Sequence, residues 1–369
     1  MTLMTFVWLV VGLVFLVIGA EWLVRGASSL AARLGVAPII IGLTVVAFGT
    51  SAPEMAVSVS GALSGNADVA LGNVVGSNTF NILFILGLSA ALSGLTINQR
   101  LLRLDIPILI VISVIAYTLA WNGLVGRLEG IVMFIGIIAY TGWLIWQSRK
   151  DAPTESAEVK QEYEDSTRKA EGSALTKSTA FQIGLVVAGL VLLVLGSRFL
   201  VDSAIEIASA LGVSELVIGL TIVAAGTSLP ELATSVLAAI RGQRDIAVGN
   251  VVGSNIFNLL AVLGASATVS KAGIAVNDEA LRLDFPVMLA ATIVLVPICW
   301  NGFAIKKWEG AVLAVFYAVY VAYLILQASD DGVPEFYRTM LMIVLPLVAL
   351  TFCVTGFQGW RKYRTSHGG

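Results

Sequence analysis

Long runs of apolar residues alternate along the chain with short polar segments. About eleven of these runs are long enough to cross a bilayer as helices, since a span needs about 20 residues. The predicted spans cover residues 4–24, 38–62, 69–93, 104–121, 128–147, 180–201, 215–240, 246–268, 283–300, 308–327 and 339–358. The first run has no basic segment before it and no small-residue cleavage site after it, so it predicts a retained span. We therefore expect an all-α polytopic membrane protein.

Composition supports a membrane protein and argues against an enzyme. Hydrophobic residues make up 57% of the chain and charged residues 12%, whereas soluble domains carry about 25% charged residues. The single histidine, His367, lies in the C-terminal tail, and the spans show no Ser–His or Ser–Lys arrangement. We expect no enzymatic activity, no cofactor and no nucleic-acid partner, and the lipid bilayer as the surroundings.

Basic residues are distributed unevenly between alternate loops. If the N-terminus lies outside, 17 of the 22 Lys and Arg residues fall in cytoplasmic segments and 5 in external ones. Cytoplasmic loops carry an excess of Lys and Arg. The sequence thus predicts an external N-terminus, with a cytoplasmic linker and a cytoplasmic C-terminus.

The chain contains two copies of one unit. GLTVVAFGTSAPE at 42–54 corresponds to GLTIVAAGTSLPE at 219–231, and GNVVGSNTFNIL at 72–83 corresponds to GNVVGSNIFNLL at 249–260, both at an offset of 177. Five spans per copy is an odd number, so the second copy enters the membrane inverted, as in many secondary transporters. The predicted domains are a first repeat at 1–147, a linker at 148–178, an inverted repeat at 179–327, an accessory helix at 338–358 and a tail at 359–369.

Each copy places one glutamate, Glu54 or Glu231, inside an apolar span. An ionised carboxylate there costs several kcal/mol unless it is compensated, so such a residue indicates a functional site. A proline precedes each glutamate, at positions 53 and 230, and removes a helical hydrogen bond. We expect both spans to break there, which is tolerated only where the backbone lines a cavity.

The second motif adds neutral oxygen ligands. Ser77 and Asn81 are four residues apart, as are Ser254 and Asn258, so each pair shares a helix face. Hydroxyls, amides, freed carbonyls and two carboxylates are hard ligands that suit Ca²⁺ and Na⁺ better than Zn²⁺ or Cu²⁺. Helix packing alone explains Gly, Ser and Asn residues in many spans, but it leaves the doubled acidic motif unexplained.

The other charged residues receive structural interpretations. Glu21 and Arg198 lie near span ends, where a local salt bridge or interfacial placement explains them. Asp105 and Asp284 each stand two residues before a proline, a position typical of a helix N-cap.

The two motifs, in both copies, resemble the alpha-repeats of the cation/calcium exchanger superfamily, with the bacterial and archaeal two-repeat sodium/calcium exchangers as the most similar branch. The resemblance covers about residues 1–327 and implies a prokaryotic plasma-membrane protein with ten repeat helices and one more. One amide position is aspartate in several members, whereas Asn81 and Asn258 are both asparagine here. The implied cation ligands are the carbonyls of Ala47 and Ala224 and the side chains of Thr50, Ser51, Glu54, Ser77, Asn81, Thr227, Ser228, Glu231, Ser254 and Asn258.

The leading hypothesis is an electrogenic Na⁺/Ca²⁺ antiporter that works by alternating access. Two carboxylates that neutralise one Ca²⁺ cannot at the same time hold several Na⁺, and this competition would couple the two fluxes. The alternative is a H⁺/Ca²⁺ antiporter, in which the glutamates take protons instead of Na⁺. The neighbouring Thr, Ser and Asn side chains favour Na⁺, because a proton does not need them.

Overall fold

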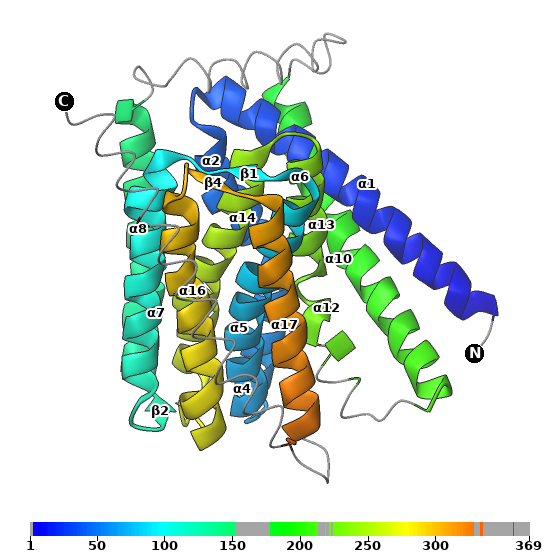
Figure 1. Ribbon diagram of the computed structural model, residues 1–369, viewed down its shortest axis with the longest axis vertical. Coiled ribbons are helices and arrows are strands. Elements are labelled where there is room, and N and C mark those ends of the chain that lie inside the picture. Colours follow the sequence, from blue (N-terminus) through cyan, green and yellow to red (C-terminus); the bar gives the residue numbers. More distant parts are fainter. Residues whose placement is uncertain are drawn as a thin grey trace.

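The computed structural model describes residues 3–151, 178–212, 218, 221–222, 224–327, 333–334 and 357, which form a bundle of helices (Figure 1). Most of the predicted linker, at 152–177, lies outside the described residues, as do the predicted tail and all of the predicted accessory helix except Phe357. Within them, eight helices are long and apolar enough to span a membrane, and a ninth span is bent. The all-α polytopic fold is confirmed.

The helices of the first copy follow the predicted spans. They are α1 (Leu3–Leu34), α2 (Pro38–Ile41), η1 (Gly42–Val46), α3 (Ala47–Thr50), α4 (Ala52–Leu63), α5 (Ala67–Phe80), η2 (Asn81–Leu86), α6 (Gly87–Ser93), η3 (Leu101–Asp105), α7 (Ile106–Ala120) and α8 (Arg127–Asp151). The η segments are π-helical turns inside longer helices.

The second copy repeats this order. Its helices are α10 (Thr179–Ala210), α12 (Ala224–Gly226), α13 (Leu229–Ile240), α14 (Arg244–Phe257), η6 (Asn258–Leu263), α15 (Gly264–Val269), η7 (Ala280–Asp284), α16 (Phe285–Trp300) and α17 (Lys307–Gln327). The π turns η2 and η6 begin at Asn81 and Asn258 respectively. Single π turns inside α-helices often mark functional sites.

Short strands join the two copies at opposite ends of the bundle. β1 (Leu95–Thr96) pairs with β4 (Ala304–Ile305), and β2 (Leu124–Val125) pairs with β3 (Ile274–Ala275) (Figure 1). Each pair joins a loop of one copy to a loop of the other, and the charge distribution predicts both loops of a pair on the same side of the membrane. The strand pairs therefore agree with an inverted arrangement of the copies.

The long helices α1 and α10 pack antiparallel along one side of the bundle (Figure 1). Gly12 and Gly19, one heptad apart, face the backbone of α10 directly. A Cβ atom at Gly12 would lie 2.8 Å from the Leu200 nitrogen, and one at Gly19 would lie 2.8 Å from the Gly189 carbonyl oxygen. Glycine is therefore required for this close approach, as in other membrane helix pairs.

The helices that carry the second motif occupy the centre of the bundle. The span Arg244–Val269 is 94% buried over its most apolar window and Ala67–Ser93 is 78% buried, whereas the other long spans range from 17% to 44%. Lipid-facing helices surround these two spans. Any polar group on their inner faces must therefore find its partners within the protein.

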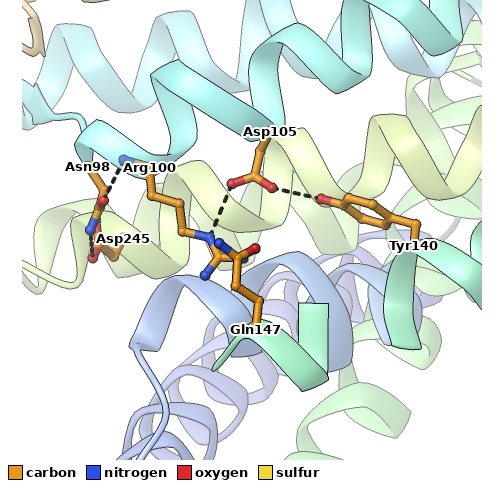
Figure 2. A network of polar contacts seen from close by, with 6 residues as sticks. All are labelled: Asn98, Arg100, Asp105, Tyr140, Gln147 and Asp245. Atoms are coloured by element: carbon orange, nitrogen blue, oxygen red, sulfur yellow. Dashed lines mark hydrogen bonds and ion pairs between the residues drawn. The ribbon is translucent and has the colours of Figure 1, made fainter. Parts of the chain in front are cut away.

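Asp105 does not cap a helix, so this interpretation was wrong. Its backbone is already helical, and its side chain makes no capping hydrogen bond. The buried carboxylate instead accepts a 3.0 Å hydrogen bond from the Tyr140 hydroxyl and lies 3.8 Å from the Arg100 guanidinium (Figure 2). Asp284 behaves likewise, because the Tyr320 hydroxyl donates to it at 2.7 Å and it makes no capping bond. Each aspartate thus joins two neighbouring helices of its own copy.

Candidate ion-binding site

The predicted break before Glu54 is present. The segments Pro38–Thr50 and Ala52–Leu63 meet at a 46° bend. The backbone of Ser51 leaves the helical conformation at the bend, with φ −83° and ψ 9°. Ser228 has nearly the same angles, φ −88° and ψ 10°, directly before α13. Both glutamates therefore lie in the first turn of a helix that starts inside the bundle.

The two helix breaks lie close together, and the serine at each break donates a hydrogen bond to the glutamate of the other copy. The Ser228 hydroxyl donates to Glu54 Oε1 at 2.8 Å, and the Ser51 hydroxyl donates to Glu231 Oε1 at 2.8 Å. All four side chains are 0% exposed. Ser254 lies 3.5 Å from Glu231 Oε1 on the same side. The structure thus brings both predicted carboxylates into one site built from both copies.

Several buried oxygens of this site have no hydrogen-bond partner among the described residues. They are Glu54 Oε2, Glu231 Oε2, Ser77 Oγ, Asn81 Oδ1 and Asn258 Oδ1. Buried polar atoms are satisfied in almost every native structure, so a group of exceptions needs an explanation. All five atoms belong to predicted cation ligands, and all five can donate lone pairs to a cation.

No basic side chain compensates the two carboxylates within the described part of the chain. The ion pairs found there join Arg100 with Asp105, Arg241 with Glu21, and Arg282 with Asp278. Across the same residues, no three His, Cys, Asp or Glu side chains gather in one metal-binding group. The site therefore combines two acidic groups with neutral oxygens. This composition suits a cation that binds and leaves better than a permanently held metal.

The remaining predicted ligands include the backbone carbonyls of Ala47 and Ala224. The Ala47 carbonyl accepts the Ser51 N–H at 3.0 Å and lies 3.4 Å from the Thr50 hydroxyl. Pro53 and Pro230 have no N–H to donate to the carbonyls of Gly49 and Gly226, four residues earlier. The Gly226 carbonyl instead accepts a hydrogen bond from the Ser197 hydroxyl at 2.6 Å. For Ala224, the structure describes the backbone, which lies one helical turn before Ser228.

Sequence reasoning did not single out the hydroxyls of Ser58 and Ser235, which lie beside two asparagines of the second motif, Asn73 and Asn250. Asn73 Nδ2 donates to Ser58 at 2.8 Å, and Asn250 Nδ2 donates to Ser235 at 2.9 Å. Ser58 and Ser235 each follow a glutamate by four residues and correspond at the offset of 177. The repeated spacing was the signal that could have identified them.

Equivalent positions in the two copies differ in exposure. On α5, Gly72 is exposed and Asn73 and Gly76 are partly exposed, and Thr227 opposite them is also partly exposed. Their counterparts in the other copy are all buried, namely Gly249, Asn250, Gly253 and Thr50. Gly249 and Gly253 are covered by the backbone of Ile39, Gly42 and Leu43, whereas the equivalent residues 216, 219 and 220 lie outside the described part of the chain.

A buried oxygen-lined site between two copies of one unit, within a bundle of membrane helices, defines a secondary ion transporter. Comparison with known proteins agrees. The sequence model of the family described as "Sodium/calcium exchanger protein" matches residues 4–146 and 181–326. The chain therefore belongs to the sodium/calcium exchanger protein family, whose members are membrane antiporters and not enzymes.

Individual relatives cover most of the chain. The putative antiporter CaxA of Alkalimonas amylolytica is 39% identical over 289 residues, which are 78% of this chain and 88% of that protein. The sodium/calcium exchanger MaX1 of Methanosarcina acetivorans is 34% identical over 349 residues, 88% of this chain and 99% of that one. A solved structure of the sodium-calcium exchanger NCX_Mj matches with a TM-score of 0.74 at 28% identity, covering 88% of this chain and 99% of that chain.

Proposed function

We propose that the protein exchanges Na⁺ for Ca²⁺, with Glu54 and Glu231 as the cation ligands that the two ions share. The observation that carries this proposal is the group of five buried, unpartnered oxygens around the two carboxylates. Ca²⁺ takes six to eight oxygen ligands, including carboxylates, amides and carbonyls. The hydroxyls of Thr50, Ser51, Thr227, Ser228 and Ser254 and the carbonyls of Ala47 and Ala224 complete the proposed set.

The charge of the site explains how the fluxes would be coupled. Asn81 and Asn258 are neutral, so the fixed charge of the site is about −2 when both glutamates are ionised, and one Ca²⁺ neutralises it. Na⁺ would use the same carboxylates, so the two cations exclude each other. Family resemblance suggests about three Na⁺ on the return, which leaves about +1 on the loaded site and makes the exchange electrogenic.

We further propose that the site works by alternating access. In an inverted repeat, one conformation opens the site to one side, and exchange of the conformations between copies opens it to the other. The distribution of Lys and Arg supports a location of β2 and β3 on the outer side. We propose an external N-terminus, a cytoplasmic linker and C-terminus, and location in a prokaryotic plasma membrane.

The test is Ca²⁺ uptake by proteoliposomes that contain the purified protein. Vesicles loaded with Na⁺ should take up Ca²⁺, and vesicles loaded with K⁺ should not. A valinomycin-set, interior-positive potential should accelerate uptake, because net positive charge leaves with Na⁺. Uptake driven by a pH gradient in the absence of Na⁺ would instead establish the H⁺/Ca²⁺ alternative. No Ca²⁺ uptake under any of these gradients would refute the proposed function.

A further inference from the structure

Asn73 and Asn250 occupy equivalent positions behind the two helix breaks. Asn250 Oδ1 accepts a hydrogen bond from the Thr50 hydroxyl of the first copy at 3.1 Å. Asn73 Oδ1 accepts a hydrogen bond from the Thr227 hydroxyl of the second copy, also at 3.1 Å. Each asparagine therefore contacts the threonine that belongs to the opposite copy. Neither asparagine is among the predicted cation ligands.

The amide nitrogens fix which way each asparagine faces. Asn73 Nδ2 donates to Ser58 Oγ at 2.8 Å and to the Glu54 carbonyl at 3.1 Å. Asn250 Nδ2 donates to Ser235 Oγ at 2.9 Å and lies 3.5 Å from the Glu231 carbonyl. A flipped amide would turn its NH₂ group toward the threonine and lose these bonds. The side-chain oxygen is thus held as an acceptor for the threonine.

The direction of the threonine hydrogen determines what the hydroxyl can bind. A threonine hydroxyl has one hydrogen and two lone pairs. When the hydrogen points at the asparagine, the lone pairs remain available to a cation. Without Asn250, the acceptors left for the Thr50 hydrogen are the Ala47 carbonyl, now at 3.4 Å, and the Glu231 carboxylate, with which Thr50 also interacts. Either hydrogen bond would occupy an oxygen that is itself a proposed ligand.

We infer that Asn73 and Asn250 are positioning residues, which direct the hydroxyl hydrogens of Thr227 and Thr50 away from the cation. This inference rests on the proposed function and deepens it. Each asparagine bonds to a threonine of the other copy. The proposed ligand Thr50 therefore depends on Asn250, and the proposed ligand Thr227 depends on Asn73. Na⁺ relies more on neutral oxygens than Ca²⁺ does, so the effect falls mainly on Na⁺.

The experiment compares Asn250→Ala with the control Ser113→Ala in the full-length purified protein. Na⁺ affinity is measured by the displacement of bound ⁴⁵Ca²⁺, which requires no turnover, and folding is checked by size-exclusion chromatography. Asn250→Ala should raise the Na⁺ concentration for half-displacement on the order of tenfold, the loss expected for about one hydrogen bond. Ser113→Ala removes a buried hydroxyl that donates to the Leu109 carbonyl of its own helix at 2.8 Å, outside the proposed site, and should shift this value by less than about twofold.

A double-mutant cycle separates positioning from a structural role. If Asn250 acts through Thr50, Asn250→Ala should have little further effect in a Thr50→Val background. Equal losses in Ser113→Ala and Asn250→Ala, or additive effects in the cycle, would each overturn the inference.

These outcomes are separable from the failure of the proposed function. A wild-type protein that binds no Ca²⁺, or whose Ca²⁺ is not displaced by Na⁺, contradicts the proposed exchange itself. A wild-type protein that shows the competition, together with an Asn250→Ala variant of unchanged Na⁺ and Ca²⁺ affinity, contradicts only the positioning role. Asn73→Ala with Thr227→Val provides the same test in the other copy and should give the same pattern.

Discussion

Replacement of Ser228 by alanine removes a hydrogen bond between the two copies together with a proposed cation ligand. Its hydroxyl donates to Glu54 Oε1 at 2.8 Å, and both side chains are 0% exposed. A hydrogen bond to a charged group is worth about 1.5–3 kcal/mol, and tenfold in affinity corresponds to about 1.4 kcal/mol. Because Ca²⁺ requires the ionised carboxylate, we expect Ser228→Ala to weaken Ca²⁺ binding by about 10- to 100-fold.

Equilibrium binding of ⁴⁵Ca²⁺ to the purified protein measures this effect. Ser51→Ala should weaken binding to a similar extent, because Ser51 donates to Glu231 at the same distance of 2.8 Å. Ser93→Ala is the matched control, since the Ser93 hydroxyl bonds to the Ser89 carbonyl of its own helix at 3.0 Å. If Ser228→Ala and Ser51→Ala bind Ca²⁺ as tightly as Ser93→Ala, the cross-copy site is wrong.

Three further predictions concern charge, stability and orientation. Glu54→Gln and Glu231→Gln should each abolish Ca²⁺ transport while the protein still elutes as a folded species, because the amide keeps the shape and removes one charge; normal Ca²⁺ flux in either variant would exclude that glutamate from the site. Tyr140→Phe removes the hydroxyl that donates to buried Asp105 and should lower the thermal midpoint in detergent, at a cost of about 1–3 kcal/mol; an unchanged midpoint would show that the bond contributes nothing. A cysteine at exposed Ser64, in the turn after α4, should react with an impermeant thiol label in intact cells, and one at exposed Leu34 should not; the reverse pattern would invert the proposed orientation.

The sequence was sufficient to predict the spans and the breaks. Most apolar runs match the described helices to within a few residues, because a bilayer leaves few alternatives to a continuous helix. The exceptions are α1 and α10, which continue to Leu34 and Ala210, about ten residues past the predicted ends. Pro53 and Pro230 predicted the breaks for a local reason, the missing N–H. The proposal that Asp105 and Asp284 are N-caps failed because each residue is already helical and bonds to a tyrosine about 35 positions later.

The sequence indicated the two buried glutamates but not their hydrogen-bond partners. Glu54 and Glu231 were identified because a carboxylate inside an apolar span is costly. The bond from Ser228 to Glu54 could not be predicted, because it depends on how the inverted copies meet. The same holds for Asn250, whose partner Thr50 lies 200 residues away in the chain. Equal spacing in both copies indicates which residues act together, whereas pairing across the interface requires the three-dimensional arrangement.

The central claim is that Na⁺ and Ca²⁺ use the same two carboxylates. Its most direct test is a titration of ⁴⁵Ca²⁺-loaded, purified protein with Na⁺ at constant ionic strength, with choline as the replaced cation. The account predicts that Na⁺ displaces all of the Ca²⁺ along a cooperative curve, since more than one Na⁺ takes its place, and that choline displaces none. Ca²⁺ that stays bound at saturating Na⁺ would contradict a shared site.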